Sequence, residues 1–266
     1  YSLVIPVYRN YQSLPKLLDQ INLLNQSLFN SLEVVFVIDG SPDNSLNYLR
    51  QQLPKESFDS QLISLSRNFG SFPAIIAGIT EARGEYFAVM AADLQDPPDL
   101  ILKFFNSLEK KDVDIAIGVR TGRDDPFIAK ALSNCFWWLY RKFVIREIPR
   151  GGVDLFACNS IFRSHLVSLK ELNTSLIGLI FWVGFRREYI NYFRLKRPYG
   201  KSAWNFNRKF RYLIDSIFAF SELPLQFIQA IGYLGILFST IFGLIIILAR
   251  IMGQIVVPGY SAIILT

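Results

Sequence analysis

The stretch of sequence that says most about the fold is residues 86–98, which read YFAVMAADLQDPP. It begins with a short apolar run, Tyr86–Met90, that is typical of a buried strand. An acid and an amide follow, Asp93 and Gln95, whose side chains would leave the same face of an extended backbone. Both supply the oxygen ligands that Mg²⁺ or Mn²⁺ prefers, and such ions usually share their coordination with substrate phosphates. We therefore predict a divalent-cation site here; the alternative is that Asp96 only caps a helix.

Similar apolar runs alternate with helical patterns through the first half of the chain. Strands are expected at Leu3–Val7, Glu33–Ile38, Gln61–Leu65, Tyr86–Met90 and Asp114–Val119, and helices at Ser13–Leu24, Phe72–Glu81 and Asp99–Glu109. Strands that are apolar throughout and separated by helices predict an α/β fold with a mostly parallel sheet covered on both faces. Ligands of such folds bind beyond the carboxyl ends of the strands, where polar residues collect in this sequence.

The C-terminal part carries a different pattern. From Leu223 to Ala249 there is no charged residue, and this run exceeds the roughly 20 residues that cross a hydrocarbon core. Basic residues precede it and no signal peptide opens the chain, so we expect the N-terminal part in the cytoplasm. We predict a multi-pass protein of the cell (inner) membrane, with one helix over 223–251 and a truncated second helix over 260–266. The chain is interpreted as a piece of a longer protein.

Other functional classes find little support. The net charge is +6, but the basic residues cluster with aromatic ones in Arg141–Arg150 and Arg186–Arg211, close to the predicted membrane segment. This pattern fits a lipid bilayer and lipid phosphates better than a nucleic acid. The two cysteines lack metal or redox spacing. The only histidine, His165, falls in a predicted helix and is interpreted as structural.

Seven motifs together resemble the family 2 glycosyltransferases of the polyprenyl-phosphate type, such as dolichol-phosphate mannose synthases and bactoprenol glucosyltransferases. They are IPVY (5–8), IDGSPD (38–43), LSRNFG (65–70), ADLQDPP (92–98), GVR (118–120), WVGF (182–185) and GKSAW (200–204). The resemblance implies a GT-A fold, a UDP- or GDP-linked sugar donor, Mg²⁺ or Mn²⁺, and a polyprenyl phosphate acceptor. It leaves the oligomeric state open, including a homo-oligomer.

The resemblance also implies roles for particular residues. It places Asp93 and Gln95 on the metal, and it implies catalytic roles for Asp93, Arg120 and Asp154. Asp154 would orient the acceptor or act as a base; the alternative is a solvated loop acid. The donor nucleotide would contact Pro6, Tyr8, Asp39, Ser41 and Arg67, and the acceptor phosphate would contact Arg120, Lys130, Ser133, Lys201 and Ser202.

The expected organisation is a catalytic domain over 1–200, an interfacial helix region over 201–222, and the membrane segments. Segments 129–144 and 202–220 are predicted to lie on the headgroup layer, the alternative being ordinary packing helices. Two other functions stay open. One is a glycan-extending transferase, although the Gln-x-x-Arg-Trp motif of such enzymes is absent from the sequence. The other is an inactive scaffold. This alternative is favoured by three positions at which the family carries polar residues and this sequence does not, namely Ile38, Ala91 and Ala203.

Overall fold

The computed structural model describes residues 1–110, 112–122, 137–149, 153–169, 175–199 and 206–253. Contacts divide the chain into two compact units, Tyr1–Phe220 and Ser221–Thr266. The expected end of the catalytic domain near residue 200 stays a prediction.

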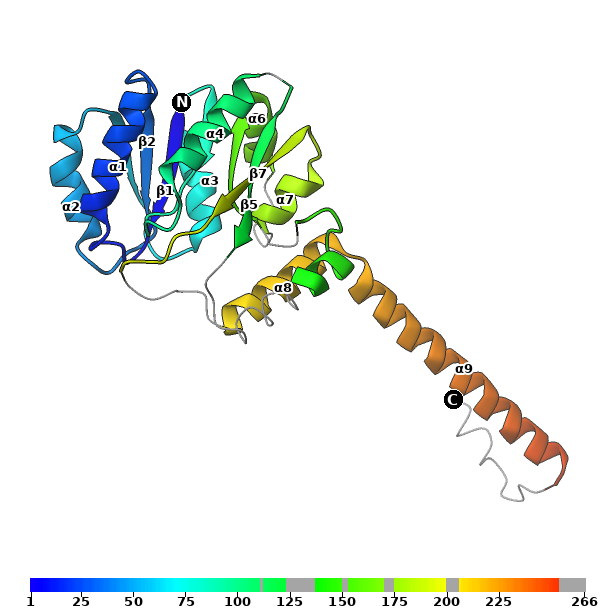
Figure 1. The fold of residues 1–266 in the computed structure, drawn as a ribbon. Helices are drawn as coiled ribbons and strands as arrows, with labels where there is room; N and C mark the ends of the chain where they lie inside the picture. Colours follow the sequence, from blue (N-terminus) through cyan, green and yellow to red (C-terminus); the bar gives the residue numbers. More distant parts are fainter. Residues whose placement is uncertain (111, 123–136, 150–152, 170–174, 200–205, 254–266) are drawn as a thin grey trace. The chain divides into compact units, whose positions relative to one another are not determined.

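Within the described residues, seven strands of the first unit form one sheet (Figure 1). They are β1 Ser2–Val7, β2 Glu33–Ile38, β3 Asp59–Ser64, β4 Tyr86–Val89, β5 Ile115–Gly122, β6 Val153–Asn159 and β7 Arg187–Phe193. Their order is β3-β2-β1-β4-β6-β5-β7. Strand β6 runs antiparallel to β4 and β5, and the other neighbouring strands pair in parallel. The predicted mostly parallel sheet is confirmed.

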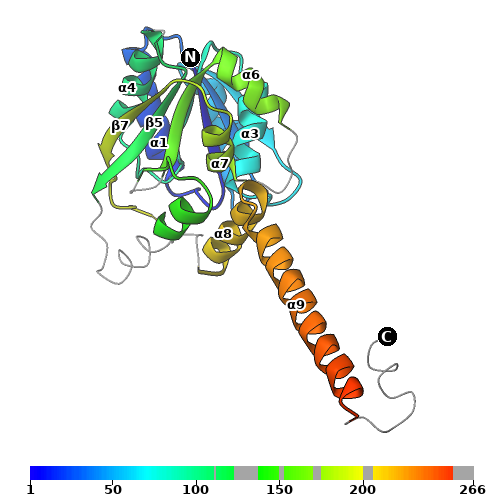
Figure 2. The same ribbon diagram turned by 90° about the vertical axis from the view of Figure 1, so that its right-hand side faces the viewer.

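Helices cover both faces of this sheet (Figure 2). They are α1 Leu14–Ser27, α2 Ser45–Gln52, α3 Ser71–Glu81, α4 Pro98–Glu109, α6 Ser160–Ser168, α7 Leu176–Trp182 and α8 Phe206–Phe220, with a short 3₁₀ turn at Leu53–Lys55 and a helical stretch at 137–143. The five predicted strands and three predicted helices occur with ends shifted by up to three residues. A helix after Asp43 and a helix around His165 were also expected, and α2 and α6 lie there, whereas β6, β7 and α7 were not predicted.

The side-chain alternation of β1 explains why its sequence from Leu3 to Val7 is apolar. Leu3, Ile5 and Val7 pack with α1 and α4 on one face, while Val4 packs with α3 on the other. Neighbouring residues of a strand point to opposite faces, so a strand covered on both sides needs apolar residues at every position.

Helix α8 packs into the apolar core on the α3 side of the sheet. Leu213 is buried there, and the ring of Tyr212 stacks on Tyr140 with centroids 5.8 Å apart. The ring of Phe220 lies so close to Gly178 of α7 that a Cβ at this position would overlap it. Glycine at this position therefore allows α7 and α8 to approach closely.

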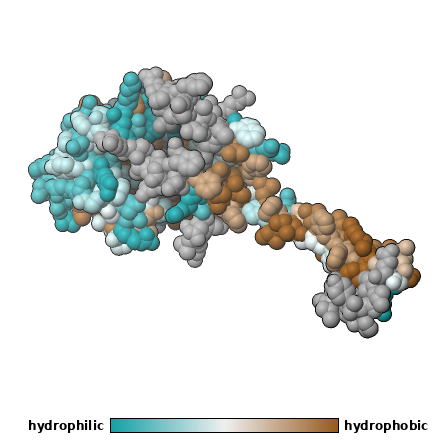
Figure 3. Space-filling view, turned by 90° about the horizontal axis from the view of Figure 1, so that it is seen from below, coloured by the Kyte–Doolittle hydropathy of each residue, from teal (hydrophilic) through white to brown (hydrophobic). Residues whose placement is uncertain are grey.

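In the second unit, α9 spans Leu223–Ile251, with the same bounds as the predicted membrane helix. It is long and apolar enough to cross a membrane by length and composition. Most of its large apolar side chains are exposed, and Figure 3 shows them as a nearly continuous apolar surface along the helix. The second predicted membrane helix, from Tyr260, lies outside the described residues.

Candidate active site

The site begins where three parallel strands end side by side. In the sheet register, Val7 of β1 faces Ile38 of β2, and Ile38 faces Ser64 of β3. The residues that follow these strands therefore share one edge of the sheet. They include four that the resemblance assigns to the nucleotide, namely Tyr8, Asp39, Ser41 and Arg67, while Pro6 is the last residue but one of β1.

Asp39 ties the loops after β2 and β3 together. Its buried carboxylate accepts hydrogen bonds from the backbone N–H of Phe69 at 2.7 Å and of Gly70 at 2.9 Å, and from Asn68 Nδ2 at 2.8 Å. Gly40 has a φ of +56°, and a Cβ there would overlap the backbone of residues 67 and 68. The described partners of Asp39 are thus the loop and the start of α3, and nucleotide contact stays a prediction.

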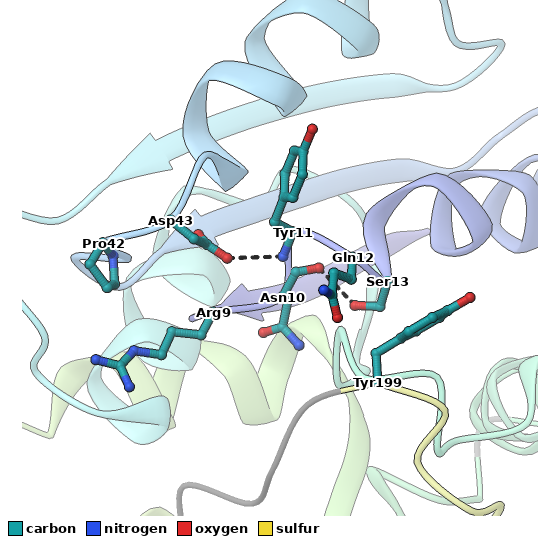
Figure 4. A pocket seen from close by; sticks show the side chains of 8 residues that line it. All are labelled: Arg9, Asn10, Tyr11, Gln12, Ser13, Pro42, Asp43 and Tyr199. Carbon is teal, nitrogen blue, oxygen red and sulfur yellow. Dashed lines mark hydrogen bonds between the residues drawn. The ribbon is translucent and has the colours of Figure 1, made fainter.

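A pocket of about 390 Å³ opens beside these loops (Figure 4). Its wall includes Asp43, which accepts hydrogen bonds from the backbone N–H of Tyr11 at 3.0 Å and from Ser41 Oγ at 2.7 Å. Burial favours the neutral acid, but hydrogen bonds from Ser45, Ser41 and Tyr11 outweigh it and lower the pKa of Asp43. The lining residues are Arg9, Asn10, Tyr11, Gln12, Ser13, Pro42, Asp43 and Tyr199.

Asp93 and Gln95 lie in a turn after β4, and their side chains converge on one cation. Arg197 Nη2 lies 2.5 Å from Asp93 Oδ2, and Arg197 Nε donates to Gln95 Oε1 at 3.3 Å. The expectation that extended backbone aligns the pair was wrong. Leu94 has a φ of +60°, and the N–H of Gln95 donates to Asp93 Oδ1 at 3.2 Å, so a turn brings the side chains together.

Arg197 belongs to residues 194–199, which follow β7 and which we call the strap. The strap is joined to the turn through backbone and side chain: the N–H of Leu195 donates to Gln95 O at 2.9 Å, and Gln95 Nε2 donates to Leu195 O at 3.1 Å. Arg194 Nη2 also lies 3.9 Å from Asp93 Oδ2. Sequence reasoning assigned this whole basic stretch to the membrane, whereas the side chains of Arg194 and Arg197 are only 14% and 25% exposed.

Beneath the turn lies a second buried acid, Asp96. Its Oδ2 accepts from the N–H of Ala91 at 3.2 Å, and it does not cap α4, whose N-cap is Pro97 without a side-chain hydrogen bond. Burial raises the pKa of Asp96 to about 6; nearby Asp93 adds to this rise, while the charges of Arg194 and Arg120 oppose it.

Arg120, near the end of β5, stands opposite Tyr192 of β7 in the sheet register. Burial and the charge of Asp96 raise the pKa of Tyr192 to about 12, and a contact with Arg120 partly offsets the rise. Arg120 is only partly exposed. The structure therefore brings Arg120 to the same cluster as Asp93 and Asp96.

The donor set at Asp93 and Gln95 fits Mg²⁺ or Mn²⁺. A carboxylate and an amide oxygen are hard ligands, and in this structure both already face a single cationic group. Among the described residues no group of three or more His, Cys, Asp or Glu side chains could hold a metal ion. Further ligands would have to come from a bound diphosphate or water.

Several predicted residues cannot be compared with the structure. Lys130, Ser133, Lys201 and Ser202 lie outside the described residues. Asp154 falls in β6, directly after Val153, which pairs with Val119 of β5; its side chain is outside the described part. Asp154 therefore lies on β6, the strand that pairs with β5, which carries Arg120. The catalytic role of Asp154 and the acceptor-binding roles of Lys130, Ser133, Lys201 and Ser202 stay predictions.

The mostly parallel sheet, with antiparallel β6 between β4 and β5 and an acidic turn after β4, has the arrangement of the GT-A fold. Residues 2–168 match the model of Glycosyl transferase family 2, and the chain belongs to this family. The predicted GT-A fold and glycosyltransferase family are thereby confirmed.

Related sequences extend over nearly the whole chain. The putative glycosyltransferase CsbB of Bacillus subtilis (strain 168) is 30% identical over 263 residues, which cover 99% of this chain and 79% of that protein. The undecaprenyl-phosphate 4-deoxy-4-formamido-L-arabinose transferase of Klebsiella pneumoniae (strain 342) is 27% identical over 256 residues, 94% of this chain and 76% of that protein.

Among solved structures, the mannosyltransferase PcManGT from Pyrobaculum calidifontis, in complex with GDP-Man and Mn²⁺, matches with a TM-score of 0.55 and 19% identity. The match covers 74% of this chain and 56% of that chain, little more than half of its length. At this identity the likeness shows the fold alone.

Proposed function

We propose that this glycosyltransferase moves a sugar from a nucleotide-sugar donor to a polyprenyl phosphate, with Mg²⁺ or Mn²⁺, at a membrane surface. The observation that carries the proposal is the similarity, over 94% of this chain, to a transferase whose name states an undecaprenyl phosphate. A polyprenyl tail stays in the bilayer, and α9 supplies a helix suited to hold the enzyme there.

On the donor side, the pocket lined by Arg9, Tyr11 and Tyr199 is the proposed place of the nucleotide. Asp93 and Gln95 would hold the metal on the donor diphosphate. A metal bound there would reduce the charge that develops on the departing nucleoside diphosphate. The turn at Leu94 fixes these two side chains before a ligand arrives, which lowers the cost of ordering them.

On the acceptor side, a phosphate monoester has a second pKa near 6 and is largely a dianion at neutral pH. It needs little help from a general base, but it must approach a donor that is itself negative. Arg120 can grip two phosphate oxygens at once, and its place beside Asp96 and Tyr192 restrains its guanidinium group. In this proposal Asp154, on the neighbouring strand, orients the acceptor.

The outer face of α8 suits an interfacial position. Phe210, Ile214 and Phe218 are spaced four residues apart, so they share one side of the helix. They are 56%, 36% and 68% exposed, while Leu213 and Ser216 are buried in the domain. An apolar stripe on a helix whose other side is already packed favours contact with the acyl boundary of a bilayer.

The test is transfer by the full chain in detergent, using a panel of UDP- and GDP-sugars, a short-chain polyprenyl phosphate and Mn²⁺. We expect a lipid-linked sugar with at least one donor, lost in EDTA and in Asp93→Asn. Asp99→Asn, an exposed acid of α4, serves as the matched control and should keep activity. Transfer to an oligosaccharide but to no lipid phosphate would overturn the proposal in favour of a glycan-extending enzyme.

A further inference from the structure

We propose that Arg197 occupies the place of the metal in the donor-free enzyme and passes to the donor diphosphate when the metal binds. Arg197 would thus be a substrate-binding residue that also balances the charge of Asp93 when no metal is bound. This inference rests on the proposed function, because it takes a metal-bound diphosphate as the ligand.

The geometry of the guanidinium group is the first support. One Arg197 side chain contacts both predicted metal ligands, Asp93 Oδ2 at 2.5 Å and Gln95 Oε1 at 3.3 Å. These are the two oxygens that would face a metal ion bound in this turn. A guanidinium group and a divalent ion cannot both fill the space between them, so metal binding requires Arg197 to move.

The balance of charge is the second support. Around the turn, the carboxylates of Asp93 and Asp96 face the guanidinium groups of Arg194 and Arg197. A divalent cation added alone would bring more positive charge to this partly buried cluster than its two carboxylates balance, which is unfavourable. A diphosphate arriving with the metal brings negative charge back, and Arg197 then gains a new partner.

The position of the strap indicates where the side chain of Arg197 would move when the metal binds. The backbone of Leu195 stays bonded to Gln95, while Tyr199, two residues beyond Arg197, lines the pocket proposed for the nucleotide. Arg197 therefore lies on the segment that connects the metal turn with the nucleotide pocket. A phosphate group between them would be within reach of a planar guanidinium group that can donate two parallel hydrogen bonds.

The proposal predicts opposite effects on two ligands in Arg197→Gln. Binding of Mn²⁺ alone to the full chain, measured by electron paramagnetic resonance of free Mn²⁺, should tighten about fivefold or more, because the competing cation is gone. Binding of inorganic pyrophosphate at saturating Mn²⁺, measured by calorimetry, should weaken about tenfold or more, because a charged hydrogen-bond donor is lost. Pyrophosphate makes the measurement independent of the nucleotide base.

Lys196→Gln is the matched control, since Lys196 is an exposed neighbour on the same strap and the charge change is the same. It should change both affinities less than about twofold, within the range of screened surface charges. Arg197→Lys keeps the charge but cannot span both oxygens, and it should give intermediate values for both ligands. This second variant keeps the test valid if Arg197→Gln folds poorly.

The outcomes separate the two proposals. If Asp93→Asn abolishes Mn²⁺ binding but the Arg197 variants bind Mn²⁺ and pyrophosphate like the wild type, the role of Arg197 is overturned and the metal site stands. If wild-type Mn²⁺ binding does not depend on Asp93, the metal site of the proposed function fails, and the role of Arg197 fails with it.

Discussion

Asp39 offers a direct test of whether a motif residue serves the ligand or the loop. In Asp39→Ala, two backbone N–H donors and one side-chain amide lose their acceptor. A hydrogen bond to a charged group contributes about 1.5–3 kcal/mol, and water can replace part of the loss because Phe69 and Gly70 are not fully buried. We therefore expect the free energy of unfolding to fall by about 2–4 kcal/mol.

The measurement is urea unfolding of the full chain in detergent, followed by tryptophan fluorescence. The midpoint should fall by roughly 1 M, given usual denaturant slopes. Amide hydrogen exchange at Phe69 and Gly70 should speed up in the same variant. Asp99→Ala removes an exposed carboxylate in the first turn of α4 and should cost less than about 1 kcal/mol. An unchanged midpoint in Asp39→Ala would refute the reasoning and leave the carboxylate to the nucleotide.

Three further predictions concern the metal turn, the packing of α8 and the buried thiol. Asp93→Asn should lower sugar transfer at least about 100-fold, and full activity in EDTA would contradict this. Gly178→Ala should cost about 1–3 kcal/mol of unfolding free energy, because its Cβ meets the ring of Phe220, and adding Phe220→Leu should recover part of the loss. Burial raises the pKa of the Cys158 thiol well above its usual range, so in a Cys135→Ser variant Cys158 should resist Ellman's reagent from pH 7 to 9 and react once the chain unfolds; labelling that rises with pH in the folded protein would count against it.

Local patterns in the sequence were enough to predict the parallel strands, the helices between them and the long apolar helix. A strand covered on both faces must be apolar along its buried length, and this requirement is visible in Val34–Ile38 without any knowledge of its neighbours. The uncharged run Leu223–Ala249 is likewise visible in the sequence, and its length is what lets a helix be long enough to cross a membrane. Strand β7 escaped prediction, since its sequence mixes charged and aromatic residues along an edge of the sheet.

The sequence alone determined that Asp93 and Gln95 follow a buried strand at the edge where ligands bind. It could not determine that Arg197, about a hundred residues later in the chain, closes on both of them. From composition we assigned Arg197 to a basic surface, because a sequence shows the charge of a side chain but not where the side chain points. Which way a side chain points depends on the pairing of β7 with β5 and on the hydrogen bonds between Leu195 and Gln95. These contacts join distant segments, so only the tertiary structure decided the partner of the candidate metal site.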